Sequence, residues 1–169
     1  MGNLVGLLLT FFLAGCGSNL PTTLGGEAKP QPKVEKIEGS VVLTDGSTLD
    51  LAGIDQPLVV MFVTYFCISC KEEAAHLSEY FAAKGGLPQN VKLVTILAGG
   101  DATKATRWAQ KNKVTWTMTF DPSAENFKRL CPEEVTPCVL TRHPKTSIEK
   151  HLGIVPVGQL EAETGPWEY

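Results

Sequence analysis

The sequence predicts an α/β fold in which a central mixed β-sheet is flanked by helices. Continuous apolar runs at residues 58–63 and 91–97 are typical of strands buried on both faces. Apolar residues at helical spacing follow both runs, and this alternation of strand and helix indicates a layered α/β domain. An Asp-Gly pair between short strand-like stretches at 40–43 and 48–51 adds an N-terminal β-hairpin.

The first helix is expected directly after the strand at 58–63 and is expected to end at Gly85-Gly86. Its apolar side chains recur at helical spacing and are Ala74, Leu77, Tyr80 and Phe81. After the strand at 91–97, Asp101 can act as the N-cap of a second helix, which we expect to run to about residue 112.

The same alternation continues in the C-terminal half. The expected elements are strands at 114–120, 135–140 and 148–152, a short helix at 121–130 and another around 159–163. Pro122 suits the first turn of the helix at 121–130, because a missing N–H is tolerated there. No internal repeat is visible in the sequence.

Charge and composition exclude several classes of partner. The net charge is −3 without a basic cluster, which argues against a nucleic-acid partner and against a polybasic membrane-binding patch. The apolar fraction of 43% is ordinary, so a core can form without a metal ion or many disulfides. We therefore expect no cofactor and no structural metal. The length of 169 residues fits one domain with extra sequence at its ends.

An apolar stretch at residues 4–13 leads to Cys16 within Leu13-Ala14-Gly15-Cys16, which resembles the lipobox of bacterial lipoproteins. The stretch is too short to span a bilayer but fits a signal peptide, whose apolar region has about 7–15 residues. No Lys or Arg precedes it, which departs from the usual signal. The alternative is a plain cleaved signal in which Cys16 has no role.

We therefore expect three parts along the chain. Residues 1–16 form a lipoprotein signal peptide with its lipobox, residues 17–36 a flexible tether, and residues 37–169 the folded domain. Either interpretation of Cys16 places the domain outside the cytoplasm, in the periplasm or at the outer cell surface, where a free dithiol must be kept reduced by a partner.

Cys67 and Cys70 lie two residues apart where the strand at 58–63 gives way to the first helix. Two thiols at this spacing can close into a disulfide ring and reopen. The positive end of the helix dipole would favour the thiolate of Cys67, the reactive form. Cys70, deeper in the helix, would then resolve a mixed disulfide by attacking Cys67. Zinc sites share this spacing, so the pair alone does not identify the chemistry.

From residue 38 to 157 the chain resembles the thioredoxin-like fold. It is most similar to the membrane-anchored thiol–disulfide oxidoreductases of the TlpA/ResA type, in the redoxin and alkyl hydroperoxide reductase (AhpC/TSA) superfamily. The resemblance rests on a buried strand followed by an aromatic residue, the two cysteines, a basic residue, a glutamate and a later Thr-Pro pair. These residues are Phe66, Cys67, Cys70, Lys71, Glu73, Thr136 and Pro137.

The resemblance implies a role for each of these positions. Pro137 is expected to be a cis-proline that faces the dithiol, with Phe66 and Thr136 contacting the substrate; an ordinary trans proline at a strand start is the alternative. Glu73 is implied to raise the pKa of the thiols and to exchange a proton with them, unless it is simply a solvated helix charge. Because Met61 stands where relatives carry Asp or Asn, Glu73 is the only nearby carboxylate candidate.

Cys131 and Cys138 lie outside the motif and bracket the loop that leads to Pro137. If both reach the same side, they can form a second, loop-closing disulfide. The alternative is a second redox pair that exchanges with Cys67 and Cys70. Strand alternation predicts that the Cys138 side chain points away from the face that Thr136 presents.

Three functions remain open. The first is a lipid-anchored thiol–disulfide oxidoreductase that reduces, or oxidises, protein disulfides; the resemblance implies a membrane thiol-transfer electron donor and suggests apocytochrome c as one substrate. The second is a peroxidase with antioxidant activity, because Thr64 and Cys67 supply the Thr-x-x-Cys of peroxiredoxins, although Val60 replaces their proline. The third is a copper chaperone with Cys67 and Cys70 as ligands and His143 as a candidate for a third.

Overall fold

The computed structural model describes residues 34–144 and 148–169, which belong to one structural unit that begins at Pro32. Cys16, the expected signal peptide and most of the expected tether lie outside the described residues. Among the helices of the described part, none is long and apolar enough to cross a membrane.

Seven strands of the described residues form one mixed sheet with the order β2-β1-β5-β4-β3-β6-β7. They are β1 (Ser40–Leu43), β2 (Thr48–Asp50), β3 (Leu58–Val63), β4 (Lys92–Ala98), β5 (Thr117–Asp121), β6 (Cys138–Arg142) and β7 (Ile148–Leu152). The three central strands β3, β4 and β5 are parallel, whereas β6, β7 and the β1–β2 hairpin pair antiparallel with their neighbours. The predicted mixed sheet with an N-terminal hairpin is therefore confirmed.

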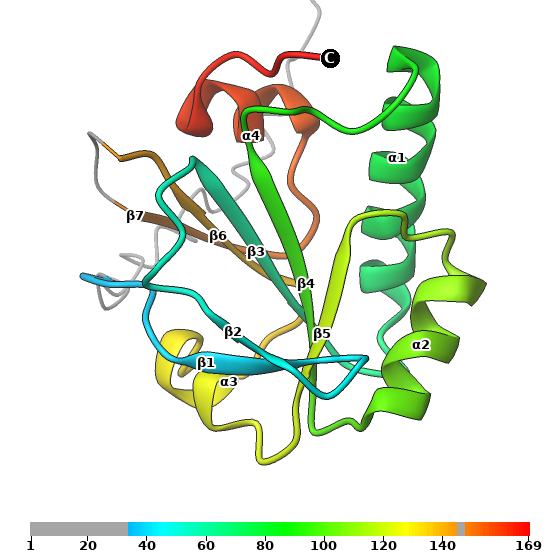
Figure 1. Ribbon diagram of the computed structural model, residues 1–169, viewed down its shortest axis with the longest axis vertical. Coiled ribbons are helices and arrows are strands. Elements are labelled where there is room, and N and C mark those ends of the chain that lie inside the picture. The colour runs from blue at the N-terminus through cyan, green and yellow to red at the C-terminus, as the bar shows by residue number, and fades with distance from the viewer. Residues whose placement is uncertain (1–33, 145–147) are drawn as a thin grey trace, which may run out of the picture. The chain divides into compact units, whose positions relative to one another are not determined.

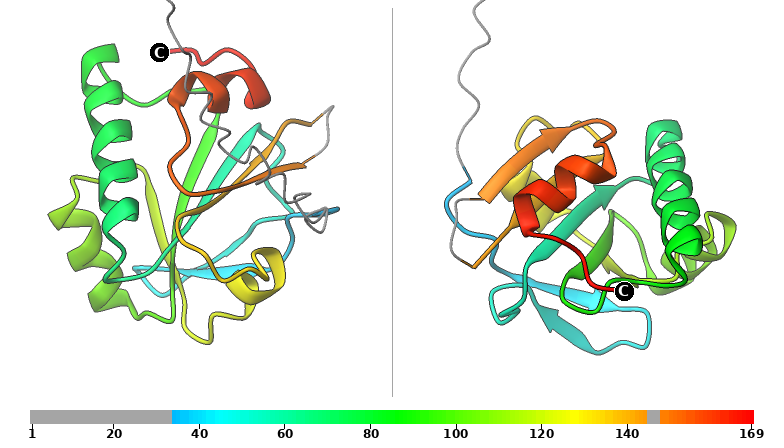
Figure 2. Two further views of the ribbon diagram at one scale, coloured as in Figure 1. Left: turned by 180° about the vertical axis from the view of Figure 1, so that it is seen from behind. Right: turned by 90° about the horizontal axis from the view of Figure 1, so that it is seen from above.

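Helices cover both faces of this sheet. They are α1 (Ile68–Lys84), α2 (Ala102–Lys111), α3 (Glu125–Leu130) and α4 (Val157–Thr164). Alternate side chains of β3 enter different cores, since Val59, Met61 and Val63 pack with α1, α2 and α4, and Leu58, Val60 and Phe62 pack with α3. Figures 1 and 2 show α1 and α2 side by side on one side of the sheet and α3 on the other.

Two expected boundaries in the C-terminal half are wrong, and local hydrogen bonds explain both. β5 begins at Thr117 rather than at residue 114, because Val114 N donates to Ala109 O (3.0 Å) and Lys113 takes a left-handed conformation that closes α2. The next helix begins at Glu125 rather than at Asp121. Asp121 stays in β5, where its carboxylate accepts a hydrogen bond from Phe127 N (3.1 Å).

The fourth expected strand also begins later than predicted, at Cys138 rather than at residue 135. The chain turns at Glu134, which has a positive φ and whose N–H donates to Cys131 O (2.9 Å). Pro137 then offers no N–H for strand pairing. Residues 131–137 therefore form a loop between α3 and β6, and this loop faces the end of β3.

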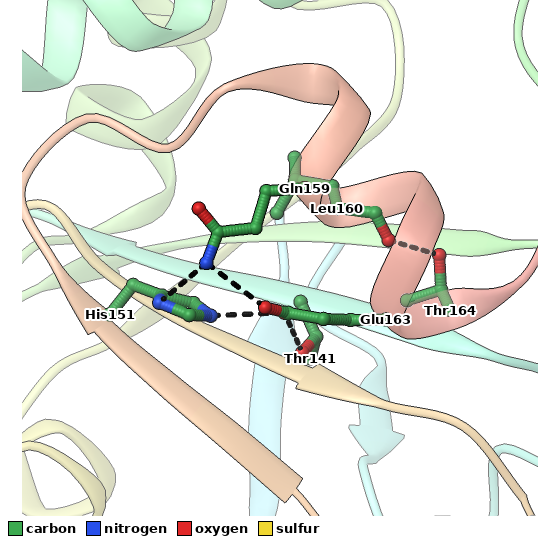
Figure 3. A network of polar contacts seen from close by, with 6 residues as sticks. All are labelled: Thr141, His151, Gln159, Leu160, Glu163 and Thr164. Atoms are coloured by element: carbon green, nitrogen blue, oxygen red, sulfur yellow. Dashed lines mark hydrogen bonds and ion pairs between the residues drawn. The ribbon is translucent and has the colours of Figure 1, made fainter.

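A polar cluster fixes α4 to the outer strands β6 and β7 (Figure 3). Glu163 of α4 accepts a hydrogen bond from Thr141 Oγ1 (2.6 Å), lies 2.9 Å from His151 Nε2 and accepts another from Gln159 Nε2 (3.1 Å). Burial raises the pKa of Glu163, but these three hydrogen bonds outweigh it and hold the pKa below its ordinary value. The cluster thereby positions the connection between β7 and α4, which contains Val155.

Candidate active site

Cys67 and Cys70 are joined by a disulfide at the start of α1. Cys67 is the N-cap residue of the helix, and its sulfur accepts a hydrogen bond from Cys70 N (3.1 Å). Negative charge on this sulfur would be stabilised by that N–H and by the positive end of the helix dipole. Cys67 is half-buried and Cys70 is fully buried, so Cys67 is the sulfur that another protein can reach.

The loop between α3 and β6 brings Thr136 and Pro137 against this disulfide. The Thr136–Pro137 peptide bond is cis, and Thr136 O lies 3.4 Å from Cys67 Sγ. In the disulfide the sulfur carries no proton, whereas the reduced thiol can donate to this carbonyl. Thr64 Oγ1 lies 3.4 Å from Thr136 Oγ1, so the threonine of the Thr-x-x-Cys motif contacts the loop.

Glu73 lies one helical turn after Cys70 on the same face of α1. Its side chain is buried, with 1% of its surface exposed, whereas the neighbouring Glu72 is exposed. Oε2 of Glu73 accepts a hydrogen bond from Val155 N (3.1 Å), and Oε1 has no hydrogen-bond partner among the described residues. Burial raises the pKa of Glu73 to about 6, against the lowering effects of the Val155 N–H and of His76. A solvated helix charge is therefore the wrong description of Glu73.

The surface around the disulfide is apolar. Phe66 is 85% exposed, Ile68 is 71% exposed and Val135 is 44% exposed. Phe66 and Ile68 flank Cys67 in the chain, and Val135 precedes Thr136. Exposed apolar side chains that gather at one place mark a surface for another protein. Phe66 was a candidate from the sequence, whereas Ile68 and Val135 were not, because their only signal was their position beside the Cys-x-x-Cys and Thr-Pro motifs.

Met61, the residue that stands where relatives carry Asp or Asn, is buried in the core that packs against α1. Its thioether offers no proton acceptor comparable to a carboxylate. Glu73 is thus the carboxylate that the fold buries one turn from Cys70.

Cys131 and Cys138 form a second disulfide, a pairing that the sequence had left open. Both residues are fully buried, and they lie in the core on the α3 face of the sheet. Cys70 lies in the core on the opposite face. The two disulfides therefore lie in different cores on opposite faces of the sheet, an arrangement that favours a structural role for the second one.

A copper site of Cys67, Cys70 and His143 is not assembled. Within the residues that the structure describes, no three side chains of His, Cys, Asp or Glu lie close enough together to hold a metal ion. His151 belongs to the cluster that fixes α4, and His76 is exposed on α1.

Solved structures share this fold at low sequence identity. A putative protein disulfide isomerase from Bacteroides thetaiotaomicron has a TM-score of 0.64 and 16% identity, covering 74% of this chain and 82% of its own. A secreted Mycobacterium tuberculosis disulfide oxidoreductase homologous to E. coli DsbE has a TM-score of 0.61 and 19% identity, covering 75% and 93%. StoA from Bacillus subtilis has a TM-score of 0.59 and 20% identity, covering 78% and 98%. These likenesses show the thioredoxin-like fold.

No protein with a curated description matches the chain by sequence. The model of the AhpC/TSA family, in contrast, matches residues 30–144, which is more than half of the chain and includes the Cys67–Cys70 disulfide, Glu73 and the Thr136–Pro137 pair. The chain, an oxidoreductase of thioredoxin-like fold, therefore belongs to the AhpC/TSA family.

Proposed function

We propose that this protein is a thiol–disulfide oxidoreductase of the TlpA/ResA type that reduces disulfides of other proteins outside the cytoplasm. The observation that carries the proposal is the Cys67–Cys70 disulfide at the start of α1, with Thr136 O 3.4 Å from Cys67 Sγ. One sulfur is accessible, the other is buried, and a carbonyl that can guide an incoming chain lies beside the accessible one.

The reaction has two exchange steps. The thiolate of Cys67 attacks one sulfur of the substrate disulfide, so that a Cys67–substrate bond forms and the other substrate sulfur leaves as a thiolate. The thiolate of Cys70 then attacks Cys67 Sγ, which closes the Cys67–Cys70 disulfide and releases the second substrate thiolate. Two electrons have passed to the substrate, and a dithiol donor restores the reduced enzyme.

In this proposal, Glu73 accepts the proton that Cys70 loses in the second exchange step. Cys70 is fully buried, so its thiol must lose a proton to a nearby group before it can attack. Glu73 lies one turn further along α1, its Oε1 has no hydrogen-bond partner in the described part of the chain, and burial raises its pKa to about 6. A carboxylate with a pKa near the working pH both accepts and returns a proton readily.

Phe66 and Thr136 hold the substrate in this proposal. The exposed ring of Phe66 supports apolar side chains next to the substrate cysteine, and the Thr136 carbonyl accepts a hydrogen bond from an extended substrate backbone. Pro137 has no backbone N–H, so it cannot donate a hydrogen bond that would compete with the substrate backbone.

The membrane location is a further part of the proposal. Residues 1–16 would be a lipoprotein signal with Cys16 as the lipid-bearing residue, residues 17–36 a tether and residues 37–169 the catalytic domain. Electrons would come from a membrane thiol-transfer protein, and apocytochrome c would be one substrate. Support comes from the lipobox-like sequence and from one structural neighbour that is described as secreted.

Reduction of insulin by dithiothreitol tests the activity. We expect the purified protein to accelerate the appearance of turbidity, and the C67S variant to show only the rate of dithiothreitol alone. The C70S variant, which keeps Cys67, should instead accumulate a mixed disulfide with insulin that is visible on a non-reducing gel. A wild-type rate equal to that of dithiothreitol alone would contradict the proposal.

A further inference from the structure

A hollow of about 420 Å³ is lined by Phe66, the residue that precedes Cys67 of the active-site disulfide. The residues that matter for its chemistry are Tyr65, Phe66, Gly99, Gly100, Lys104 and Arg107. Tyr65 and Phe66 immediately precede Cys67 in the chain, Gly99 and Gly100 connect β4 to α2, and the two basic residues belong to α2. A polypeptide bound to Cys67 would therefore have this hollow directly beside it.

Gly99 and Gly100 also line the hollow, and a side chain is disfavoured at both positions. Gly99 has a φ of +67°, a conformation that disfavours any side chain. A Cβ on Gly100 would lie 2.3 Å from Leu97 Cδ2, so a side chain there would collide with the core. The wall nearest Cys67 is aromatic, because the rings of Tyr65 and Phe66 pack edge to face with centroids 5.2 Å apart.

Another part of the wall is positively charged, because Lys104 and Arg107 also line the hollow. Lys104 and Arg107 are exposed and lie three residues apart, so they share one face of α2. Arg107 has no ion pair or hydrogen bond to any described residue. Lys104 has an exposed ion pair with Asp101 (Nζ to Oδ2, 3.8 Å), while Asp101 Oδ1 caps the helix by accepting from Lys104 N. This wall thus carries an excess of positive charge, although the whole chain has a net charge of −3.

We propose that this hollow selects protein disulfides that carry an Asp or Glu beside the reacting cysteine. The carboxylate would pair with Arg107, with Lys104 adding a second positive charge, while an apolar neighbour packs on the exposed ring of Phe66. The proposal rests on the proposed function, since it names the substrates of the same dithiol. A polypeptide fits better than an isolated anion, because the hollow combines an aromatic wall, a charged wall and the reactive sulfur.

Three peptide disulfides that differ only in the residue before the cysteine, which is Glu, Gln or Lys, provide the test. Each is reduced by the full-length protein with dithiothreitol as electron donor, and kcat/KM is compared. We expect the order Glu, Gln, Lys, with about a 2- to 5-fold difference between the Glu and Lys peptides, as for exposed ion pairs. Salt should reduce this difference, because exposed charges are screened.

Variants of α2 test whether Lys104 and Arg107 cause the preference for the Glu peptide. K104Q/R107Q should bring the Glu and Lys peptides to equal kcat/KM, and K104E/R107E should reverse their order. The control K111Q/K128Q removes the same charge from exposed positions at the end of α2 and on α3, and it should keep the wild-type preference and the wild-type rate for the Gln peptide.

The outcomes separate the two proposals. Equal rates for the Glu and Lys peptides with the wild type, or a preference that survives in K104Q/R107Q, would overturn the acidic-substrate proposal while leaving the reductase activity in place. Failure to reduce any of the three peptides would count against the proposed function instead. Titration calorimetry with the same peptides, carrying Ser in place of Cys, then tests the charge preference through binding alone.

Discussion

At the scale of single residues, Glu73 is a carboxylate that the fold buries away from solvent. Burial raises its pKa from 4.5 to about 6. Since the folded-state pKa lies above the unfolded one, the folded protein holds a proton that the unfolded chain has already lost between these two values. The free energy of unfolding therefore falls as the pH rises from 4.5 to 6. Above pH 6 the buried charge of Glu73 lowers the free energy of unfolding by its full amount, about 2 kcal/mol.

We predict that E73Q stabilises the oxidised protein and slows its chemistry. A neutral amide avoids the cost of a buried charge, so the free energy of unfolding should rise by up to about 2 kcal/mol above pH 6 and stay unchanged below pH 4.5. Release of the substrate from the Cys67 mixed disulfide should slow by about 10²-fold and lose its rise with pH near 6, because Cys70 has lost its proton acceptor. Urea unfolding and stopped-flow measurements over pH 4–8 check both expectations.

Glu72 offers a matched control for this experiment, since it is an exposed glutamate one residue earlier in α1. E72Q should leave both the pH profile and the rate of release near those of the wild type. A rate of release in E73Q equal to that of the wild type at pH 7 would show that Glu73 is not the proton acceptor of Cys70.

At the scale of elements, the loop of residues 131–137 determines what faces the dithiol. The Cys131–Cys138 disulfide closes it, and Lys150 of β7 donates to Glu133 of the loop (2.5 Å) with its own side chain almost fully buried. These two restraints hold the segment that presents the Thr136 carbonyl to Cys67. The second disulfide is thus placed to support the active site through this loop.

We predict that C131A/C138A lowers both stability and activity. Loss of a disulfide that closes so short a loop should reduce the free energy of unfolding by about 2–3 kcal/mol. A less restrained Thr136 should lower kcat/KM for insulin by about tenfold, because a small misplacement of a positioning group slows a reaction strongly. Urea unfolding of the oxidised proteins and the insulin assay check this expectation. An unchanged kcat/KM would show that the loop holds its position without the disulfide.

A second segment, the connection between β7 and α4, contacts Glu73. This connection contains Val155, whose N–H is the one hydrogen-bond donor to the Glu73 carboxylate among the described residues. The Glu163 cluster shown in Figure 3 anchors this connection by fixing α4 to β6 and β7. The environment of Glu73 therefore depends on residues that are far from it in the chain.

At the scale of the whole molecule, the parallel strands direct the chemistry to one edge of the sheet. The carboxyl end of β3 leads to Cys67, and the carboxyl end of β4 leads to Gly99 and to the basic face of α2. Carboxyl ends of neighbouring parallel strands lie at the same edge, which is where open α/β sheets bind ligands. The reactive sulfur and the hollow proposed to select its substrate are thus adjacent because of the sheet order.

We predict that the full-length protein is held at a membrane through Cys16. Expressed in bacteria, the wild type should enter the detergent phase on partition with Triton X-114, because acyl chains anchor a protein to a bilayer. C16A should move to the aqueous phase, whereas C67S, which also removes one cysteine, should stay with the detergent. A wild-type protein found in the aqueous phase would contradict lipidation and leave the plain cleaved signal as the explanation.

Local sequence patterns were sufficient for much of the fold and for part of the site. The apolar run of β3, the Asp101 cap of α2 and the Cys-x-x-Cys motif at a helix start are short-range signals, and each lies where it was predicted. The starts of β5 and α3 were wrong because single hydrogen bonds at Val114 and Phe127 decided them. Such bonds leave no periodic pattern in a sequence.

By itself, the sequence determined the α/β class, the position of the dithiol at a helix start and the candidates Glu73 and Pro137. The tertiary structure alone decided that Val155 binds Glu73, that the two disulfides lie on opposite faces of the sheet, and that Lys104 and Arg107 line the same hollow as Phe66. The physical reason is that the two kinds of interaction act over different separations along the chain. Periodicity and capping act over a few residues, whereas strand order and register bring together groups that are tens of residues apart.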